Sequence, residues 1–187
     1  MPGPAPPGWK GQNDMFNLGS MLNLGSTDPV VGRASTVVRC STGELFQFLG
    51  ENLFQNYPKW SPEVKELEQI TPGAVQLGTI GRQVRIDHGR RTESRFKISA
   101  YDPGQRLTLL GVPDPFRCTY EFQRIDSDEA TRLTFTFELL ELLMVMRPME
   151  GLVRAAIKDG AERTVQNIKR LIETGKPAGA PPVQEMP

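Results

Sequence analysis

The chain has 187 residues, and its 22 lysines and arginines balance 22 aspartates and glutamates. This neutral charge excludes a general electrostatic attraction to nucleic acid or anionic lipid. A single histidine and two distant cysteines do not suit a metal cluster or a disulfide framework, so we expect the reduced thiols of a cytoplasmic protein. No Sec-type signal pattern opens the sequence, and the longest apolar stretch, 139–146, is far shorter than the roughly 20 residues of a membrane span.

Both ends of the chain are rich in proline and glycine, and we predict disordered tails over residues 1–33 and 175–187. Two similar hexapeptides follow each other in the first tail, MFNLGS at 15–20 and MLNLGS at 21–26. This segment is either part of a mobile tail or a short apolar segment that docks on this protein or on a partner protein. The residues between the tails are predicted to form one domain, 34–174.

The domain is predicted to open with a strand at 34–40, where β-branched residues are frequent. Ser41 then has the position of a helix N-cap, and Glu44 completes a capping box ahead of the apolar run LFQFL. We expect this helical region to break near Gly50 and to end near Gln55, because prolines follow.

The middle of the chain consists of segments with strand-like alternation, at 63–70, 79–87, 91–101, 106–111, 117–125 and 132–140. Tyr120 and Phe122 alternate with polar residues, and Phe135 and Phe137 do the same. This pattern predicts an antiparallel sheet with one covered face and one wet face.

The last element is predicted to be a long helix from about Pro148 to Ile172, with apolar residues at helical spacing. Its apolar stripe narrows to small residues at Ala156, Gly160 and Ala161. Small side chains there either let the helix approach the sheet closely or leave room for a molecule between helix and sheet.

This order of elements resembles that of the START/birch-pollen-allergen superfamily, also called SRPBCC, and within it the polyketide cyclase/dehydrase-like proteins. The resemblance extends over 34–174 and is carried by GELFQFL (43–49), NYPKWSPEV (56–64), LGTIGRQV (77–84) and RLTFTFEL (132–139). It implies an α+β helix-grip fold, in which a curved antiparallel sheet of about six to seven strands wraps around the long C-terminal helix, with two short helices after the first strand. A cavity between sheet and helix would hold an apolar or amphipathic ligand. No fixed catalytic motif unites the superfamily, so the resemblance implies no catalytic residue, metal or cofactor.

The stretch RQVRIDHGRRTESRF, residues 82–96, combines the single histidine with a cluster of arginines. Apolar residues at even positions predict a hairpin with its tip near His88, which we expect to be exposed and non-catalytic. Arg82 shares that parity with Val84 and is predicted to point inward, whereas Arg85 is predicted to face solvent. A buried guanidinium needs a partner, and for Arg82 this is either a carboxylate or carbonyl of the protein or an anionic headgroup of a ligand. The remaining alternative is that strand twist carries Arg82 to water. The stretch lacks interleaved aromatic residues, so we expect no nucleic-acid partner.

We predict that the ligand contacts one polar handle and several residues on the covered face of the sheet and on the last helix. These residues are Arg82, Ser94, Phe96, Tyr120, Phe122, Phe135, Met149, Val153 and Ala156. Tyr120 is either a core residue or a group that orients a ligand carbonyl. In an enzyme, Tyr120 or Arg82 would polarise the carbonyl of the substrate.

Three functions are compatible with these observations. The first is binding of a small apolar or amphipathic molecule, such as a lipid, an isoprenoid or a polyketide-like ring system. The second is catalysis of the polyketide cyclase or dehydratase type. The third is a protein-interaction module like the chaperone-activator relatives of the superfamily, with residues 15–26 as the contact.

Overall fold

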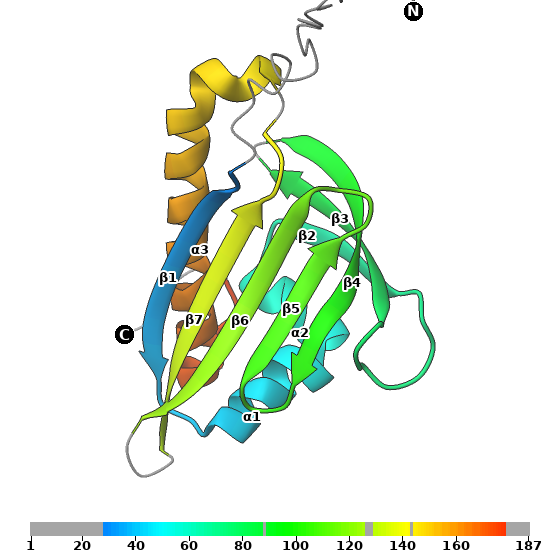
Figure 1. Cartoon of the computed structure of the whole chain (residues 1–187). Helices are drawn as coiled ribbons and strands as arrows, with labels where there is room; N and C mark the ends of the chain where they lie inside the picture. The colour runs from blue at the N-terminus through cyan, green and yellow to red at the C-terminus, as the bar shows by residue number, and fades with distance from the viewer. Residues whose placement is uncertain (1–27, 88, 126–128, 143, 179–187) are drawn as a thin grey trace, which may run out of the picture.

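The computed structural model of the protein describes residues 28–87, 89–125, 129–142 and 144–178. A single antiparallel sheet is covered on one face by a long helix, α3 (Glu150–Thr174) (Figure 1). The strands are β1 (Val30–Val38), β2 (Val64–Gln69), β3 (Ile80–Asp87), β4 (Arg90–Asp102), β5 (Arg106–Gly111), β6 (Phe116–Ile125) and β7 (Ala130–Leu139). Their order across the sheet is β1-β7-β6-β5-β4-β3-β2. With its short helices after the first strand, this is the helix-grip arrangement that the sequence predicts.

The first strand begins earlier than the sequence indicates, at Val30 rather than Ala34. The helix after it begins where it is predicted to begin. Ser41 Oγ accepts a hydrogen bond from the Glu44 backbone N–H at 3.2 Å, and the Glu44 carboxylate accepts one from the Ser41 backbone N–H at 3.0 Å. This capping box starts α1 (Thr42–Phe46) and is confirmed.

The helical region runs further than the sequence suggests. Its later parts are a π-helical turn, η2 (Gln47–Glu51), and α2 (Leu53–Trp60). The predicted break at Gly50 falls in the π-helical turn, but α2 continues through Pro58, so the predicted end near Gln55 is wrong. A proline removes one backbone hydrogen bond from the helix, and burial of Tyr57 and Trp60 in the core offsets this loss.

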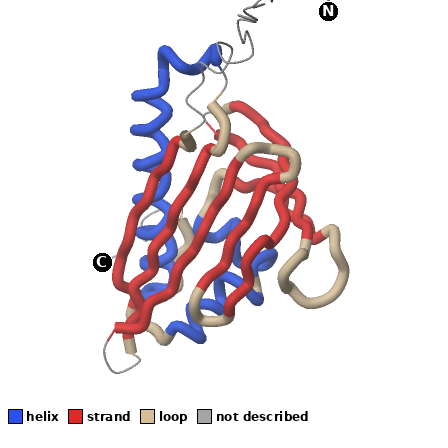
Figure 2. Tube along the Cα trace, in the orientation of Figure 1, coloured by secondary structure: helices blue, strands red, loops and turns tan. Residues whose placement is uncertain are grey.

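The covered face of the sheet carries the core, and β6 and β7 show the predicted alternation. Tyr120 and Phe122 of β6 and Phe135 of β7 are all buried. Rings from the helices pack against this face, and Phe46 of α1 lies edge-on to Phe122 with 5.5 Å between the ring centroids. Figure 2 shows the short helices gathered behind one end of the sheet. α3 lies on the same face along β1 and β7, and its C-terminal half meets the end of α2, where the Asn167 side chain donates to the Trp60 carbonyl at 3.0 Å.

α3 follows a short 3-10 helix, η3 (Met144–Met149), and packs on the sheet mainly with its C-terminal half. Its buried residues are Ala161, Val165, Ile168 and Leu171. Gly175 ends the helix in the left-handed conformation, with φ of 68°. By contrast, Met149 and Leu152 at the start of α3 are exposed. The first turn of the helix is therefore less buried than its C-terminal half.

One close approach fixes where α3 crosses β1. A Cβ atom placed on Gly32 would lie 2.6 Å from the backbone oxygen of Ile157. Because backbone atoms cannot move aside as a flexible side chain can, only glycine allows this approach. Gly32 therefore sets the distance of the helix from the edge of the sheet.

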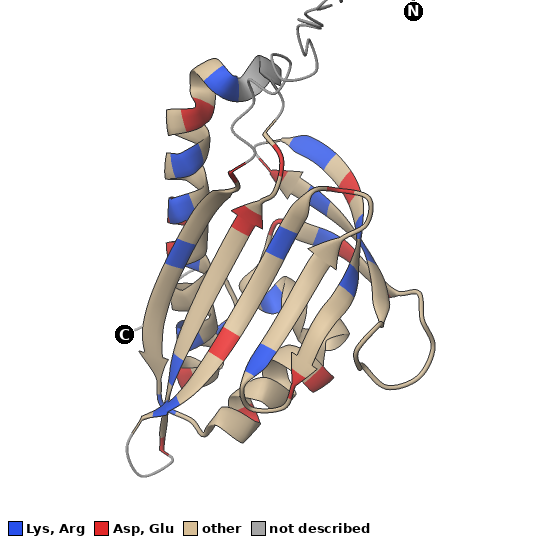
Figure 3. Cartoon of the chain, in the orientation of Figure 1, with Lys and Arg blue, Asp and Glu red and all other residues tan. Residues whose placement is uncertain are grey.

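The outer face of the sheet is polar, and residues of both charge signs are interspersed on it (Figure 3). Arg33 pairs with Glu121 at 3.0 Å, and the Arg117 guanidinium donates two hydrogen bonds to the Glu138 carboxylate. Ion pairs of this exposed kind contribute little to stability. None of the helices in the described part of the chain is long and apolar enough to cross a membrane.

Candidate functional site: a cavity between α3 and the sheet

A cavity of about 520 Å³ lies under the middle of α3, where residues from Ala156 to Asn167 contribute to its lining. It is enclosed by the end of α2, strands β3, β4, β6 and β7, the β5–β6 connection and α3. Its volume is within the range of sites that hold a small organic molecule. The lining residues fall into an apolar wall and a polar end.

The apolar wall is built from aromatic rings of the sheet and small residues of α3. Phe116 and Phe137 stack with 6.3 Å between centroids, and the Tyr120 and Phe135 rings lie 4.8 Å apart in a tilted arrangement. Opposite them the helix contributes its small residues, Ala156, Gly160 and Ala161. The sequence left two roles open for these small residues, close packing on the sheet or room for a molecule. They line the open space between helix and sheet.

The polar end is organised around Arg85 of β3. Its Nε and Nη2 atoms donate to the two carboxylate oxygens of Asp87, each at 3.2 Å, and Nη1 donates to Ser61 Oγ at 3.3 Å. Burial works against the charged form of Arg85, but Tyr57, Asp87 and Glu63 outweigh it and raise the pKa of Arg85. The guanidinium therefore stays charged at the boundary between the cavity and solvent.

Two buried polar atoms of the lining lack a hydrogen-bond partner in the described part of the chain, Trp60 Nε1 and Gln83 Oε1. The side-chain amide of Gln83 donates from Nε2 to Ser94 Oγ at 3.1 Å, which leaves its oxygen unpaired. The indole of Trp60 lies close enough to the Tyr120 hydroxyl to lower the pKa of Tyr120 slightly, but the contact falls short of hydrogen-bond geometry. A buried polar atom without a partner costs about 1–3 kcal/mol, so these two positions favour a bound group that pairs with them.

The phenols at this end of the cavity are neutral. Burial raises the pKa of Tyr57 to about 12 and raises the pKa of Tyr120 well above its ordinary value. Burial likewise raises the pKa of the Cys118 thiol, to about 12. Tyr57 and Tyr120 can therefore donate hydrogen bonds from their hydroxyls at any physiological pH.

The prediction that Arg82 points into the cavity and Arg85 points to solvent is wrong, and the cause is the register of the β3–β4 hairpin. Asp87 pairs with Arg90, so odd positions of β3 lie opposite even positions of β4. The assumed even-with-even pairing is off by one residue, and such a slip exchanges the two faces of a strand. Gln83 and Arg85 consequently line the cavity.

Arg82 instead belongs to the outer face, where carboxylates surround it. Its Nε atom donates to Glu93 at 2.7 Å, and Nη1 donates to Glu66 at 3.3 Å. These bonds raise the pKa of Arg82 and hold the pKa of the Glu93 carboxyl below its usual range. Of the partners expected for Arg82, the structure contains the protein carboxylates.

The other predicted ligand contacts divide into three groups. Ser94, Tyr120, Phe135 and Ala156 line the cavity. Phe96 and Phe122 lie on the covered face but are buried in the core, where Phe96 stacks on Phe54 at 6.1 Å. Met149 is half exposed, and neither Met149 nor Val153 lines the cavity, whose contacts with α3 begin at Ala156.

Several lining residues were absent from the predicted set: Tyr57, Trp60, Gln83, Arg85 and Cys118. Cys118 shares the parity of Tyr120, so the alternation could have indicated it. Gln83 and Arg85 are polar, and a prediction that assigns apolar residues to the interior places polar residues such as these on the solvent face. His88 lies outside the described residues. In the described part of the chain, no group of three or more histidine, cysteine, aspartate or glutamate side chains could hold a metal ion.

The fold is that of a helix-grip protein, and it contains a cavity between the sheet and the long helix. Residues 30–173 match the family described as polyketide cyclase/dehydrase and lipid transport, and the chain belongs to this family. No curated protein is similar enough to match.

Solved structures share the fold at low sequence identity. TTHA0849 from Thermus thermophilus is 16% identical with a TM-score of 0.61, over 78% of this chain and 98% of that chain. A START superfamily protein from Mycobacterium smegmatis is 15% identical with a TM-score of 0.58, over 75% of this chain and 98% of that chain. The di-domain ARO/CYC BexL from the BE-7585A biosynthetic pathway is 11% identical with a TM-score of 0.59, over 76% of this chain and 46% of that chain.

Proposed function

We propose that the protein binds a neutral amphipathic small molecule with a ring-containing body and an oxygen at one end. The body would lie against the aromatic wall and the small residues of α3. The oxygen would lie at the polar end, where it could accept hydrogen bonds from Trp60, Tyr120 and Arg85. A polyketide-like or isoprenoid-derived ring system has this chemistry, and we extend the proposal to a cytoplasmic location because Cys40 and Cys118 are free thiols.

The unpaired polar atoms of the lining carry this proposal. Trp60 Nε1 is a donor only, and in the described part of the chain it has no acceptor. A ligand with a carbonyl or hydroxyl oxygen would supply that acceptor. A ligand hydroxyl could also donate to Gln83 Oε1, the unpaired acceptor of the same cavity. A purely aliphatic ligand would leave both atoms unpaired.

The charge of the lining supports a neutral ligand rather than an anionic one. Arg85 is already neutralised by the bidentate carboxylate of Asp87. Glu63 and Asp114 also line the cavity, with Arg163 as the second cation, whereas the Glu93 carboxylate is paired with Arg82 on the outer face. A carboxylate or phosphate headgroup would meet this excess of negative charge, and like charges within a few ångström repel strongly in a partly buried site.

The experiment that tests the proposal has two steps. Native mass spectrometry of the purified full chain should show a co-purified neutral molecule. Titration with 2-naphthol as a probe should then show binding that Arg85→Gln weakens about tenfold, the loss expected for one hydrogen bond to a charged group. Arg82→Gln is the matched control, since Arg82 lies on the same strand but outside the cavity, and it should change the affinity less than twofold. Equal effects of the two variants, or no binding of the probe, would contradict the proposal.

A second candidate function is a cyclase or dehydratase reaction, favoured by the convergence of donors at one point. When a proton leaves the carbon next to a ketone, the ketone oxygen becomes an enolate oxygen. Arg85 and the neutral Tyr120 phenol could stabilise that charge, and the Glu63 carboxylate of the same lining could take the proton. The enolate would then collapse to form the C=C bond as the β C–O bond breaks, and the proton on Glu63 would pass to the departing hydroxyl, which leaves as water.

4-Hydroxy-4-phenylbutan-2-one is a suitable probe for this reaction, because its dehydration gives a conjugated enone with strong ultraviolet absorption. Turnover should fall at least a hundredfold in Tyr120→Phe and in Glu63→Gln while 2-naphthol binding by Glu63→Gln persists. Binding without turnover in the wild-type protein would leave the binding function and remove the catalytic one.

A further inference from the structure

The last turn of α2 ends at a residue of the cavity, Trp60, and the C-terminal part of the chain holds this turn from outside. The last carbonyl groups of a helix lack donors within the helix itself. In α2 the Trp60 carbonyl accepts a hydrogen bond from Asn167 Nδ2 of α3 at 3.0 Å. The Lys59 carbonyl accepts one from the Ala178 N–H at 2.8 Å. Two of the last carbonyls of α2 thus take their donors from α3 and from the segment that follows it.

The orientation of the Asn167 amide follows from its two hydrogen bonds. Arg170 Nη2, one turn further along α3, donates to Asn167 Oδ1 at 3.2 Å. A guanidinium can only donate, so the atom that faces Arg170 is the amide oxygen, and the atom that faces Trp60 is the amide nitrogen. Asn167 therefore acts on α2 as a donor, and a side chain that only accepts cannot replace it.

The rings that pack on the Trp60 indole do not fix it relative to α3. Phe48 and Tyr57 lie beside it, with centroids 6.0 and 5.3 Å away, and both belong to the same helical region as Trp60. A small movement of this region would carry the three rings together. The bond from Asn167 to the Trp60 carbonyl, by contrast, ties the region to the helix that closes the cavity.

Asn167 lies on the face of α3 that lines the cavity. It follows Gly160 by seven residues, which is about two helical turns, and both residues belong to the lining. Trp60 belongs to it as well, and within the described residues its buried Nε1 atom has no acceptor. An N–H group bonds well only to an acceptor that lies close to its own direction. The direction of the indole therefore decides which ligand oxygen it can reach.

We infer that Asn167 is a positioning residue of the binding site. Through the Trp60 carbonyl it holds the indole N–H at the place where a ligand oxygen accepts from it. The inference rests on the proposed function, in which Trp60 donates to an oxygen of a neutral ligand. It adds that recognition of this oxygen depends on a contact between two helices.

Two substitutions of Asn167 in the full chain test this role. Asn167→Leu removes the donor and keeps a side chain of similar size, and Asn167→Asp keeps the shape and the acceptor for Arg170. Both should lower the affinity for 2-naphthol about fivefold, the loss of about one neutral hydrogen bond. Both should change the affinity for naphthalene, which has no oxygen, less than twofold. Equal weakening of the two ligands would show a purely structural role and would overturn the inference.

Lys169→Leu is the matched control. Lys169 also lies on α3, and its Nζ atom donates to a backbone carbonyl of another element, that of Val37 in β1, at 2.6 Å. It does not belong to the cavity lining. Its loss should leave both affinities within twofold of the wild-type values. A fivefold loss of 2-naphthol affinity in Lys169→Leu would show that any anchor of α3 has this effect, and Asn167 would then have no special role.

The indole N–H signal of Trp60 in a ¹⁵N–¹H spectrum tests the placement without a ligand. Trp9→Phe in the parent protein and in every variant removes the chain's other tryptophan. The signal should shift in Asn167→Leu and stay in place in Lys169→Leu, and an unmoved signal in Asn167→Leu would overturn the inference. If the parent protein binds 2-naphthol no better than naphthalene, the proposed function fails, and the indole signal alone decides whether Asn167 positions Trp60.

Discussion

Arg85 and Asp87 lie two residues apart on the inward side of β3 and form a bidentate ion pair, with both N–O distances at 3.2 Å. Successive side chains of a strand point to opposite faces, so positions two apart share a face and can bond to each other. The pair supplies the cavity with a cation whose charge is already compensated. In the function proposed above, such a pair would favour polar but uncharged groups of a ligand.

Removing the Asp87 carboxylate should shift the ligand preference from uncharged towards anionic groups. Asp87→Asn keeps the size of the side chain but leaves the guanidinium charge without its partner. We expect the affinity for 2-naphthoate to rise about tenfold, because a ligand carboxylate can then take the place of Asp87. The affinity for 2-naphthol should change less than twofold. Isothermal titration with the two ligands measures both numbers.

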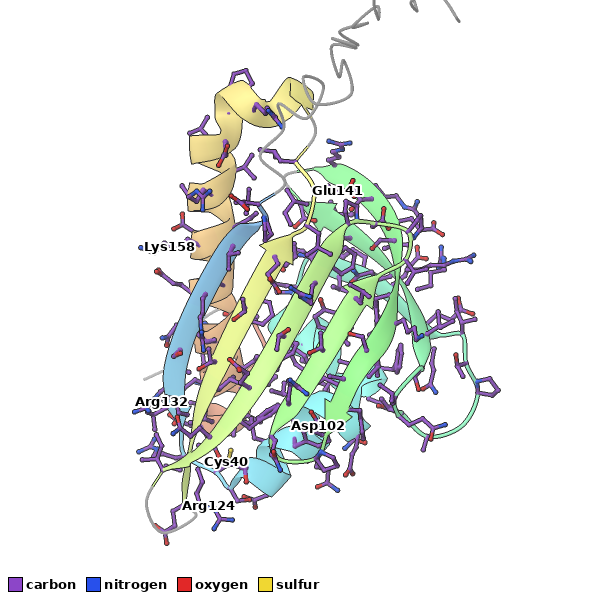
Figure 4. All side chains as sticks on the ribbon, in the orientation of Figure 1. Cys40, Asp102, Arg124, Arg132, Glu141 and Lys158 are labelled. Carbon is purple, nitrogen blue, oxygen red and sulfur yellow. The ribbon has the colours of Figure 1, made fainter. Side chains whose placement is uncertain are left out.

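Asp102→Asn is the matched control for this change. Asp102 also holds an arginine, Arg106, at 2.9 Å, but it ends β4 and does not line the cavity, whose β4 residues lie at the start of that strand (Figure 4). It should alter neither affinity. An unchanged preference for 2-naphthol in Asp87→Asn would show that the charge of the Arg85–Asp87 pair does not select the ligand.

A stability measurement tests the close approach of β1 and α3. Gly32→Ala should lower the free energy of unfolding by about 1–3 kcal/mol, since the new methyl group meets the backbone of Ile157. Gly151→Ala should raise it by about 0.5–1 kcal/mol, because a Cβ there meets nothing within 4 Å and alanine favours the helix. Urea unfolding of both variants gives the comparison. A stable Gly32→Ala protein would mean that the helix can shift on the sheet.

Alkaline pH should weaken the fold through Cys118. Its pKa is about 12 in the folded protein and about 9.0 when unperturbed, so the thiol keeps its proton longer in the folded state. The stability that comes with this difference is complete below pH 9 and is lost as the pH rises towards 12. Above pH 9 each unit should cost about 1.4 kcal/mol from this group.

Cys118→Ala should therefore show a shallower decline of unfolding free energy between pH 9 and pH 10.5 than the wild-type protein. Below pH 8.5 the two profiles should run parallel. Thr119→Ala, on the opposite face of the same strand, should keep the steep decline. Profiles that stay parallel through pH 10.5 would show that the thiol is not protected by burial.

The sequence was informative wherever apolar residues lie inside. β6 and β7 obey the alternation, and the cavity residues Tyr120 and Phe135 follow from it. The rule failed on β3, where Gln83 and Arg85 face inward because that part of the interior is a polar cavity. Val84 is nevertheless buried on the outer face, paired with Glu93 and next to Glu66, whose long side chains can cover it. The register of the β3–β4 hairpin determines which residues of β3 face inward. That register depends on the length of the turn, which the sequence left ambiguous.

The helix stripe illustrates a second limit. Ala156, Gly160 and Ala161 were compatible with close packing or with a cavity, and the sequence could not choose. The choice depends on what lies opposite, and Phe135, Phe137 and Tyr120 there leave the space open. Close approach occurs instead at Gly32 and Ile157, where the glycine is on the strand.

A substitution at Gln83 distinguishes a role in ligand binding from a role in stability. Its amide oxygen is buried without a partner in the described residues, and its nitrogen bonds to Ser94. Gln83→Met keeps the length of the side chain and removes both atoms. The lost hydrogen bond and the relieved unpaired oxygen oppose each other, so the free energy of unfolding should stay within about 1 kcal/mol of the wild-type value. The affinity for 2-naphthol should nevertheless fall about fivefold, the loss of about one neutral hydrogen bond.

Thr108→Val provides the contrast. Thr108 is buried on the outer face, and its hydroxyl lies 3.3 Å from Thr119 Oγ1, so its polar group is satisfied within the protein. Removing it should lower the free energy of unfolding by about 1 kcal/mol and leave 2-naphthol binding unchanged. A residue that serves stability should thus change the free energy of unfolding but not the affinity, and a residue that serves a ligand should do the reverse. If Gln83→Met instead loses stability and retains affinity, its amide is part of the scaffold, and the ligand oxygen pairs only with donors such as Trp60, Tyr120 and Arg85.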